Sequence, residues 1–123
     1  MIGLAREAMK IVGVNIGALS VKIIALKGAE QRPEIVAHHG RPLAVLKKLL
    51  AEKDFADADY FGVSGHLGHI SEAAAIQRAL REVKSNFDAV VSLGGETFLV
   101  YIVAGGRISN VLSHNKCAAG SGE

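Results

Sequence analysis

The sequence predicts an α/β fold in which a three-strand unit occurs twice. Apolar, β-branched runs occur in two sets of three in the same order: 11–14, 20–26 and 34–38, then 89–93, 97–103 and 107–112. Short turns join the runs, and most of these turns contain glycine. Half of the 123 residues are hydrophobic and 21% are charged, a composition that excludes intrinsic disorder.

Two amphipathic helices and a short strand are predicted between these sets. Pro42 suits the first position of a helix, and leucines follow it at helical spacing: Leu43, Leu46, Leu49 and Leu50. Residues 60–63 then form a short strand. Ser71 can cap a second helix that ends near Asn86 and has an inward stripe of Ala73, Ile76, Leu80 and Val83.

Composition excludes several classes of function. The net charge of +2 comes from scattered residues, and aromatic residues make up 5% of the chain, so nucleic acid is not an expected partner. No apolar run is long enough to span a membrane, and the start of the chain does not resemble a signal peptide. The single cysteine excludes an internal disulfide. We therefore expect a cytoplasmic protein.

The turn after the first strand can bind an anion. Gly17 leaves room for backbone N–H groups to converge on a phosphate. Asn15 precedes the glycine, and Ser20 and Lys22 add a hydroxyl group and a cation after it. An ordinary hairpin with a solvated lysine is the alternative.

A second turn, Gly94-Gly95-Glu96-Thr97, matches the first if Gly17 corresponds to Gly95, 78 residues later. It offers a carboxylate for an attacking water or a metal-bound water, and a hydroxyl group. Two such turns facing each other would hold the phosphates of a nucleotide from both sides.

The end of the chain contains a candidate metal ligand. Cys117 follows Lys116 and precedes small residues, and the neighbouring cation is expected to lower the pKa of the thiol. One cysteine cannot build a cluster site alone, but a symmetric dimer would supply two. An inert cysteine is the alternative.

Three stretches resemble the BadF/BadG/BcrA/BcrD ATPase family, which comprises activators of 2-hydroxyacyl-CoA dehydratases and ATPase subunits of benzoyl-CoA reductases. The most specific is Asn115-Lys116-Cys117-Ala118-Ala119-Gly120-Ser121-Gly122-Glu123. The second is Leu93-Gly94-Gly95-Glu96-Thr97-Phe98-Leu99-Val100-Tyr101. The third, Gly13 to Lys22, is similar to the first phosphate loop of the family.

The resemblance implies an actin-like (ribonuclease-H-like) ATPase fold, in which two lobes close on ATP and Mg²⁺. Residues 1–88 would form a shortened first lobe, and residues 89–123 would begin the second. The first phosphate loop would contain Asn15, Gly17, Ser20 and Lys22. The second would contain Gly94, Gly95 and Thr97, with Glu96 as the catalytic residue. Family members are homodimers that share a 4Fe-4S cluster. Cys117 matches one ligand per subunit, and the second ligand is not in this chain.

The implied function is that of the N-terminal portion of an ATP-dependent activator. It would transfer a low-potential electron from the iron-sulfur cluster to an acyl-CoA dehydratase or reductase component. The full-length protein would be an enzyme, and this chain alone would be inactive. One alternative is a degenerate actin-like module for dimerisation or docking, because Asn15 and Leu93 stand where the family has Asp. The interpretation as a sugar or acetate kinase relative is weaker, because such enzymes do not need the segment around Cys117.

The histidines are not predicted to be central to the site. His38 and His39 would point to opposite faces of a strand, so they cannot bind one metal ion together and are expected at a strand end and turn. His66 and His69 flank a glycine in a loop after a strand, which is where sites form in α/β folds, and by that analogy they would have a minor role near the nucleotide.

Overall fold

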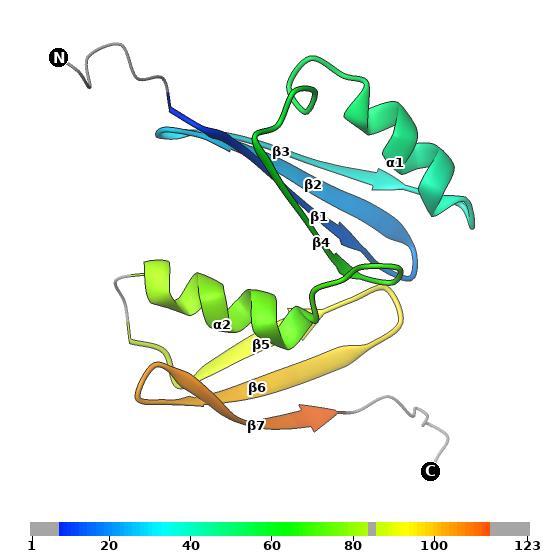
Figure 1. Ribbon diagram of the computed structural model, residues 1–123. Coiled ribbons are helices and arrows are strands. Elements are labelled where there is room, and N and C mark those ends of the chain that lie inside the picture. The colour runs from blue at the N-terminus through cyan, green and yellow to red at the C-terminus, as the bar shows by residue number, and fades with distance from the viewer. Residues whose placement is uncertain (1–7, 84–85, 114–123) are drawn as a thin grey trace, which may run out of the picture. The chain divides into compact units, whose positions relative to one another are not determined.

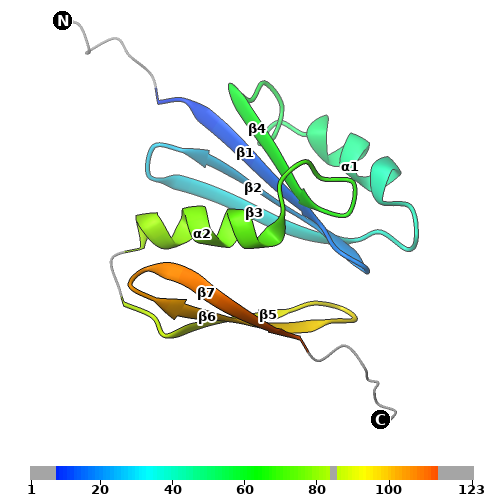
Figure 2. The ribbon, with the colours of Figure 1, turned by 60° about the horizontal axis from the view of Figure 1, so that its bottom comes forward.

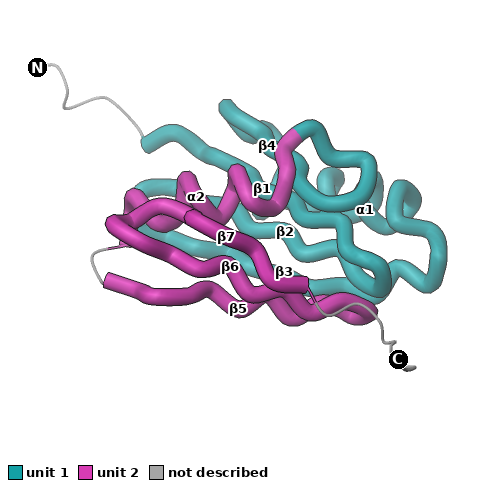
Figure 3. Tube along the Cα trace, turned by 90° about the horizontal axis from the view of Figure 1, so that it is seen from below, with its two compact units in different colours: residues 1–69 teal, residues 70–123 magenta. Residues whose placement is uncertain are grey.

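The computed structural model describes residues 8–83 and 86–113 and divides into two compact units between His69 and Ile70 (Figures 1 and 3). The second helix contacts the strands that follow it and belongs to the second compact unit. The boundary between two ATPase lobes after residue 88 stays a prediction.

The first unit is a four-stranded mixed sheet with one helix (Figure 1). Its elements are β1 (Lys10–Ile16), β2 (Ser20–Lys27), β3 (Glu30–Ala37), α1 (Pro42–Leu50) and β4 (Tyr60–Gly65). The strand order is β3-β2-β1-β4. Strand β1 pairs antiparallel with β2 and parallel with β4. All three opening strands and the short strand were predicted.

Alternate residues of β1 and β2 form the core of this unit. The buried apolar side chains are Val12, Val14, Ile16, Val21, Ile23, Ala25, Leu49, Phe55 and Val63. Helix α1 buries Leu49 there, and Leu46 and Leu50 pack partly against the same cluster. Leu43, in the first turn of the helix, is 60% exposed. The predicted apolar face of α1 is therefore confirmed for Leu46, Leu49 and Leu50 and not for Leu43.

The second unit is a three-stranded antiparallel sheet with one helix along it (Figure 2). Its elements are α2 (Glu72–Glu82), β5 (Ala89–Leu93), β6 (Phe98–Ala104) and β7 (Arg107–Ser113), in the strand order β5-β6-β7. Ser71 caps α2 as predicted, because its Oγ accepts a hydrogen bond from the Ala74 N–H at 3.1 Å. The helix ends at Glu82 rather than near Asn86, since Val83 already has an extended backbone.

Polar contacts attach α2 to the sheet. The Tyr101 hydroxyl donates to Glu72 Oε1 at 2.6 Å, and Ser92 Oγ donates to Glu72 Oε2 at 2.9 Å. At the next turns of the helix, Gln77 donates to the Gly106 carbonyl at 3.0 Å and accepts from the Ile108 N–H at 2.8 Å. The N-terminal end and the middle of α2 are thereby hydrogen-bonded to the strands.

Within the described residues, no helix is long and apolar enough to cross a membrane.

Tyr101 gives a test of this packing. Its side chain is 3% exposed, and burial, followed by the hydrogen bond and the charge of Glu72, raises its pKa from 10.0 to about 12. The pKa is higher in the folded state than in the unfolded state, so the neutral phenol contributes stability that is fully present below pH 10 and is lost as the pH rises through about 12.

The measurement is a phenolate absorbance titration of the Tyr60→Phe variant, which leaves Tyr101 as the single tyrosine of the chain. We expect ionisation near pH 12 in the folded protein. Ionisation near pH 10 in a protein that is still folded would contradict the described burial of Tyr101 and its contact with Glu72.

Candidate functional site

The turn between β1 and β2 brings together the four residues predicted for the first phosphate loop. The Gly17 N–H donates to the Ser20 carbonyl at 2.9 Å and closes the turn. Asn15 and Lys22 are cross-strand partners at the ends of the two strands. Lys22 Nζ donates to Ser20 Oγ at 3.2 Å. A cation, a hydroxyl group and an amide thus lie around one glycine.

Gly17 leaves a space that these groups border. A Cβ atom at this position would lie 3.6 Å from Lys22 Nζ and 3.9 Å from Asn15 Oδ1. The N–H groups of Ala18 and Leu19, at the tip of the turn, make no hydrogen bond within the described residues. Backbone donors next to a lysine ammonium group suit a phosphate oxygen.

Strand β4 fixes the orientation of Asn15. Parallel pairing places Ser64 beside Asn15, and Asn15 Nδ2 donates to Ser64 Oγ at 3.0 Å. The Asn15 Oδ1 atom makes no hydrogen bond to the described residues, so it is available to a metal-bound water. An amide oxygen is uncharged and is a weaker partner for Mg²⁺ than a carboxylate.

The loop after β4 approaches the same end of β1. The His66 N–H donates to the Ile16 carbonyl at 2.8 Å. Gly65 has a φ of +85°, and a Cβ atom there would lie 2.3 Å from the Ile16 oxygen. Only a glycine permits this approach. It is the contact that brings the β4 loop, which includes the predicted His66, to the phosphate-loop end of the sheet.

Sequence reasoning missed two residues at this turn, Ser64 and His38. His38 Nε2 lies 2.9 Å from the Gly17 carbonyl oxygen. The predicted position of His38 and His39 at a strand end and turn is confirmed, because β3 ends at Ala37 and His39 has a φ of +50°. A prediction of the parallel β1–β4 pair would have found Ser64, whereas no local pattern indicates His38.

The turn between β5 and β6 has the same closing hydrogen bond. The Gly94 N–H donates to the Thr97 carbonyl at 2.9 Å, as Gly17 does to Ser20 in the first turn. Gly17 therefore corresponds to Gly94, 77 residues later, and the predicted match to Gly95 is wrong. With this alignment Asn15 corresponds to Ser92 rather than to Leu93.

The second turn is open to solvent. Gly94, Gly95, Glu96 and Thr97 are all exposed, and Glu96 makes no hydrogen bond or ion pair with the described residues. Ser92, two residues before the turn, donates instead to Glu72. The Glu96 carboxylate can accept a proton or orient a water there.

The cluster-cysteine segment lies outside the described residues. This holds for Cys117, for the string 115–123 around it and for His114. Within residues 8–83 and 86–113 no group of three or more His, Cys, Asp or Glu could hold a metal ion.

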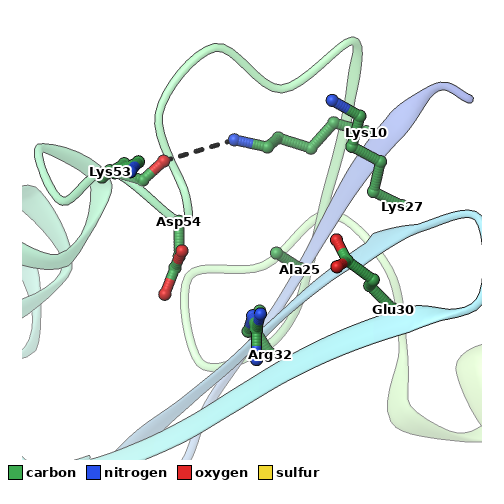
Figure 4. Close-up of a pocket in the computed structure, with 7 residues that line it drawn as sticks. All are labelled: Lys10, Ala25, Lys27, Glu30, Arg32, Lys53 and Asp54. Carbon is green, nitrogen blue, oxygen red and sulfur yellow. Dashed lines mark hydrogen bonds between the residues drawn. The ribbon is translucent and has the colours of Figure 1, made fainter. Parts of the chain in front are cut away.

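A charged hollow with a volume of about 300 Å³ lies at the end of the β1–β2 pair opposite the Gly17 turn (Figure 4). It is lined by Lys10, Ala25, Lys27, Glu30, Arg32, Lys53 and Asp54. Lys10 Nζ already donates to the carbonyl oxygens of Lys53 at 3.3 Å and Ala56 at 2.8 Å. Glu30 and Asp54 offset two of the three other cations, which are Lys27, Arg32 and Lys53.

The arrangement of the strands identifies the fold. Two units, each containing an antiparallel three-strand meander, and the parallel strand β4 in the first, form part of the actin-like ATPase fold. No protein-family model and no curated protein matches the sequence. The assignment of the fold therefore rests on solved structures.

Three of these structures are informative. The chain is similar to component A of (R)-2-hydroxyglutaryl-CoA dehydratase from Acidaminococcus fermentans, with a TM-score of 0.71 and 21% identity over 90% of this chain and 49% of that one. Two structures of the Ppx/GppA phosphatase family from Aquifex aeolicus match with TM-scores of 0.51 and 0.50 at 13% and 15% identity. Each alignment covers 87% of this chain, and 52% and 51% of those chains. The chain thus spans about half the length of the structures it matches.

Gly65→Ala tests the approach of the β4 loop to β1. Backbone strain at positive φ and the contact with the Ile16 oxygen should together lower the free energy of unfolding by about 3 kcal/mol. Gly28→Ala is the matched control, because Gly28 has a φ of +61° but its Cβ would meet no atom closer than 3.6 Å. It should lose only about 1 kcal/mol. Equal losses, measured by denaturant unfolding, would contradict the described contact.

Proposed function

We propose that this chain is the N-terminal portion of an ATP-dependent activator. It would transfer a low-potential electron from an iron-sulfur cluster to a 2-hydroxyacyl-CoA dehydratase or benzoyl-CoA reductase type enzyme. The observation that carries the proposal is the grouping of Asn15, Ser20 and Lys22 around Gly17. The likeness in fold to a dehydratase component supports it, as does the sequence resemblance of the segment around Cys117.

The first turn would bind the phosphates of ATP. The Lys22 ammonium group would neutralise phosphate charge, and the Ser20 hydroxyl group and the Ala18 N–H would donate to phosphate oxygens. Asn15 Oδ1 would accept a hydrogen bond from a water bound to Mg²⁺. Each of these groups is held in place by contacts within the first unit.

The second turn would supply the catalytic carboxylate. Glu96 is exposed and unpaired among the described residues, so it can orient a water for attack on the terminal phosphate and accept its proton. The N–H groups of Gly95 and Glu96 in the same turn make no hydrogen bond with the described residues and could stabilise negative charge on the phosphate.

Cys117 would be one ligand of the cluster, with the same residue of a second subunit as another. A 4Fe-4S cluster supplies one electron at low potential, and ATP hydrolysis would drive the transfer of that electron to the dehydratase or reductase component. Homodimer formation and this partner are parts of the proposal.

A non-enzymatic actin-like module is the second candidate, and one observation favours it. Asn15 and Ser92, which correspond when Gly17 is aligned with Gly94, both have neutral side chains that are engaged elsewhere, Asn15 with Ser64 and Ser92 with Glu72. Such a module would bind phosphate without Mg²⁺-dependent hydrolysis. In that case hydrolysis would also not appear in the Asn15→Asp variant.

Lys22→Ala tests the phosphate-binding turn. Loss of the ammonium group should weaken the binding of magnesium tripolyphosphate and Mg·ATP at least about tenfold, as measured by calorimetry. Lys27→Ala is the matched control, because it removes a cation from the other end of β2 and should change the affinity less than about twofold. Equal effects of the two variants would contradict phosphate binding at the Gly17 turn.

Cys117→Ser tests the cluster. After anaerobic reconstitution with iron and sulfide, a dimeric protein long enough to carry both cluster cysteines should show the broad visible absorbance of a 4Fe-4S cluster, and its Cys117→Ser variant should not. Absorbance that is equal in the two proteins would exclude Cys117 as a ligand.

A further inference from the structure

We propose that His38 is a positioning residue, which holds the β1–β2 turn in the shape that binds phosphate. The inference rests on the proposed function and assigns a role within the same site. His38 is 7% exposed, and apart from Tyr101 it is the one side chain with polar atoms that is buried among the described residues. Burial of an imidazole is costly unless both ring nitrogens find partners.

Both ring nitrogens of His38 have partners, and these partners define its tautomer. The Gly40 N–H donates to Nδ1 at 3.0 Å, so Nδ1 carries no proton. Nε2 therefore carries the proton and donates it to the Gly17 carbonyl oxygen at 2.9 Å. The imidazole connects the residue after β3 to the central glycine of the phosphate-binding turn.

The main chain of His38 makes a second connection to the same turn. Its N–H donates to the Leu19 carbonyl at 3.0 Å. One residue therefore holds two carbonyl groups of the three-residue segment 17–19.

These two bonds orient the backbone donors of the turn. In a trans peptide the carbonyl of one residue and the N–H of the next point in opposite directions. The chain contains no cis peptide bond among its described residues. With the Gly17 carbonyl directed at His38, the Ala18 N–H must point away from the imidazole. The Ala18 N–H makes no hydrogen bond within the described residues, so it is free to meet an anion.

The turn after His38 places the Gly40 N–H where it can donate to Nδ1 of the imidazole ring. His39 and Gly40 both have positive φ, +50° and +79°, and this reversal brings the Gly40 N–H back to the ring. The Arg41 N–H then donates to the His38 carbonyl at 2.8 Å, directly before α1 begins at Pro42. The shape of the phosphate-binding turn is thereby coupled to the start of α1.

Two isosteric variants separate positioning from packing. In His38→Gln the side-chain amide reaches the place of Nε2 and can still donate to the Gly17 carbonyl. In His38→Asn it reaches the place of Nδ1 and can still accept from the Gly40 N–H. Each variant keeps one of the two ring hydrogen bonds, so both should lose a similar amount of stability. Only His38→Asn should release the Gly17 carbonyl.

The first readout needs no ligand. In the wild-type protein, NMR should detect protonated Nε2 and a through-bond coupling from it to the Gly17 carbonyl carbon. The chemical shifts of that carbon and of the Ala18 amide should move in His38→Asn and stay near wild type in His38→Gln. Unprotonated Nε2 in the wild-type protein would overturn the inference without any variant.

The second readout is the affinity for magnesium tripolyphosphate. His38→Asn should bind at least about tenfold more weakly, and His38→Gln should stay within about threefold of wild type. Equal affinities of the two variants would overturn the role of His38 while leaving the proposed function intact. A wild-type protein that does not bind tripolyphosphate would instead contradict the proposed function and the phosphate-binding role of His38 together.

Discussion

The approach of Gly65 to the Ile16 carbonyl is the constraint on which the first site depends. A side chain at Gly65 would lie 2.3 Å from the Ile16 oxygen, so the parallel pairing of β4 with the end of β1 needs a residue without Cβ. That pairing places Ser64 against Asn15, and His38 holds the Gly17 carbonyl. The β1–β2 turn is thus restrained by β4 and by the residue after β3, both of which are distant from it in the sequence. Its exposed donors are fixed before any ligand arrives, which lowers the ordering cost of binding.

The two glycine turns share a backbone and differ in their chemistry. Each is closed by an N–H of the first glycine and a carbonyl three residues later. The first turn has a lysine and a buried histidine that holds its backbone. The second has at its tip a carboxylate with no partner among the described residues, and the serine before it donates to Glu72 on α2. These differences suit a phosphate-binding role for one turn and a catalytic role for the other.

Much of the fold could be predicted from local signals, while the contacts that shape the site could not. Pro42 and Ser71 mark the starts of both helices, and apolar runs mark each strand, because those signals lie within a few residues of what they specify. Ser64 and His38 act through partners at distant positions in the sequence, which only a strand pairing reveals. The spacing of the repeat was predicted wrongly because Gly94 and Gly95 are adjacent and the pattern alone does not show which one closes the turn. Helical periodicity identifies a helix but not the sheet that it covers, so it does not show that α2 belongs to the same compact unit as β5, β6 and β7.

The central claim is that the β1–β2 turn is a phosphate-binding loop, and NMR mapping tests it most directly. Magnesium tripolyphosphate is added to the protein labelled with ¹⁵N, and the amide shifts are followed. The account predicts the largest shifts at Ala18 and Leu19, with little change at the glycine turn of residues 105–106 between β6 and β7. Shifts centred instead on Arg32 and Lys53, in the hollow at the other end of the β1–β2 pair, would contradict it.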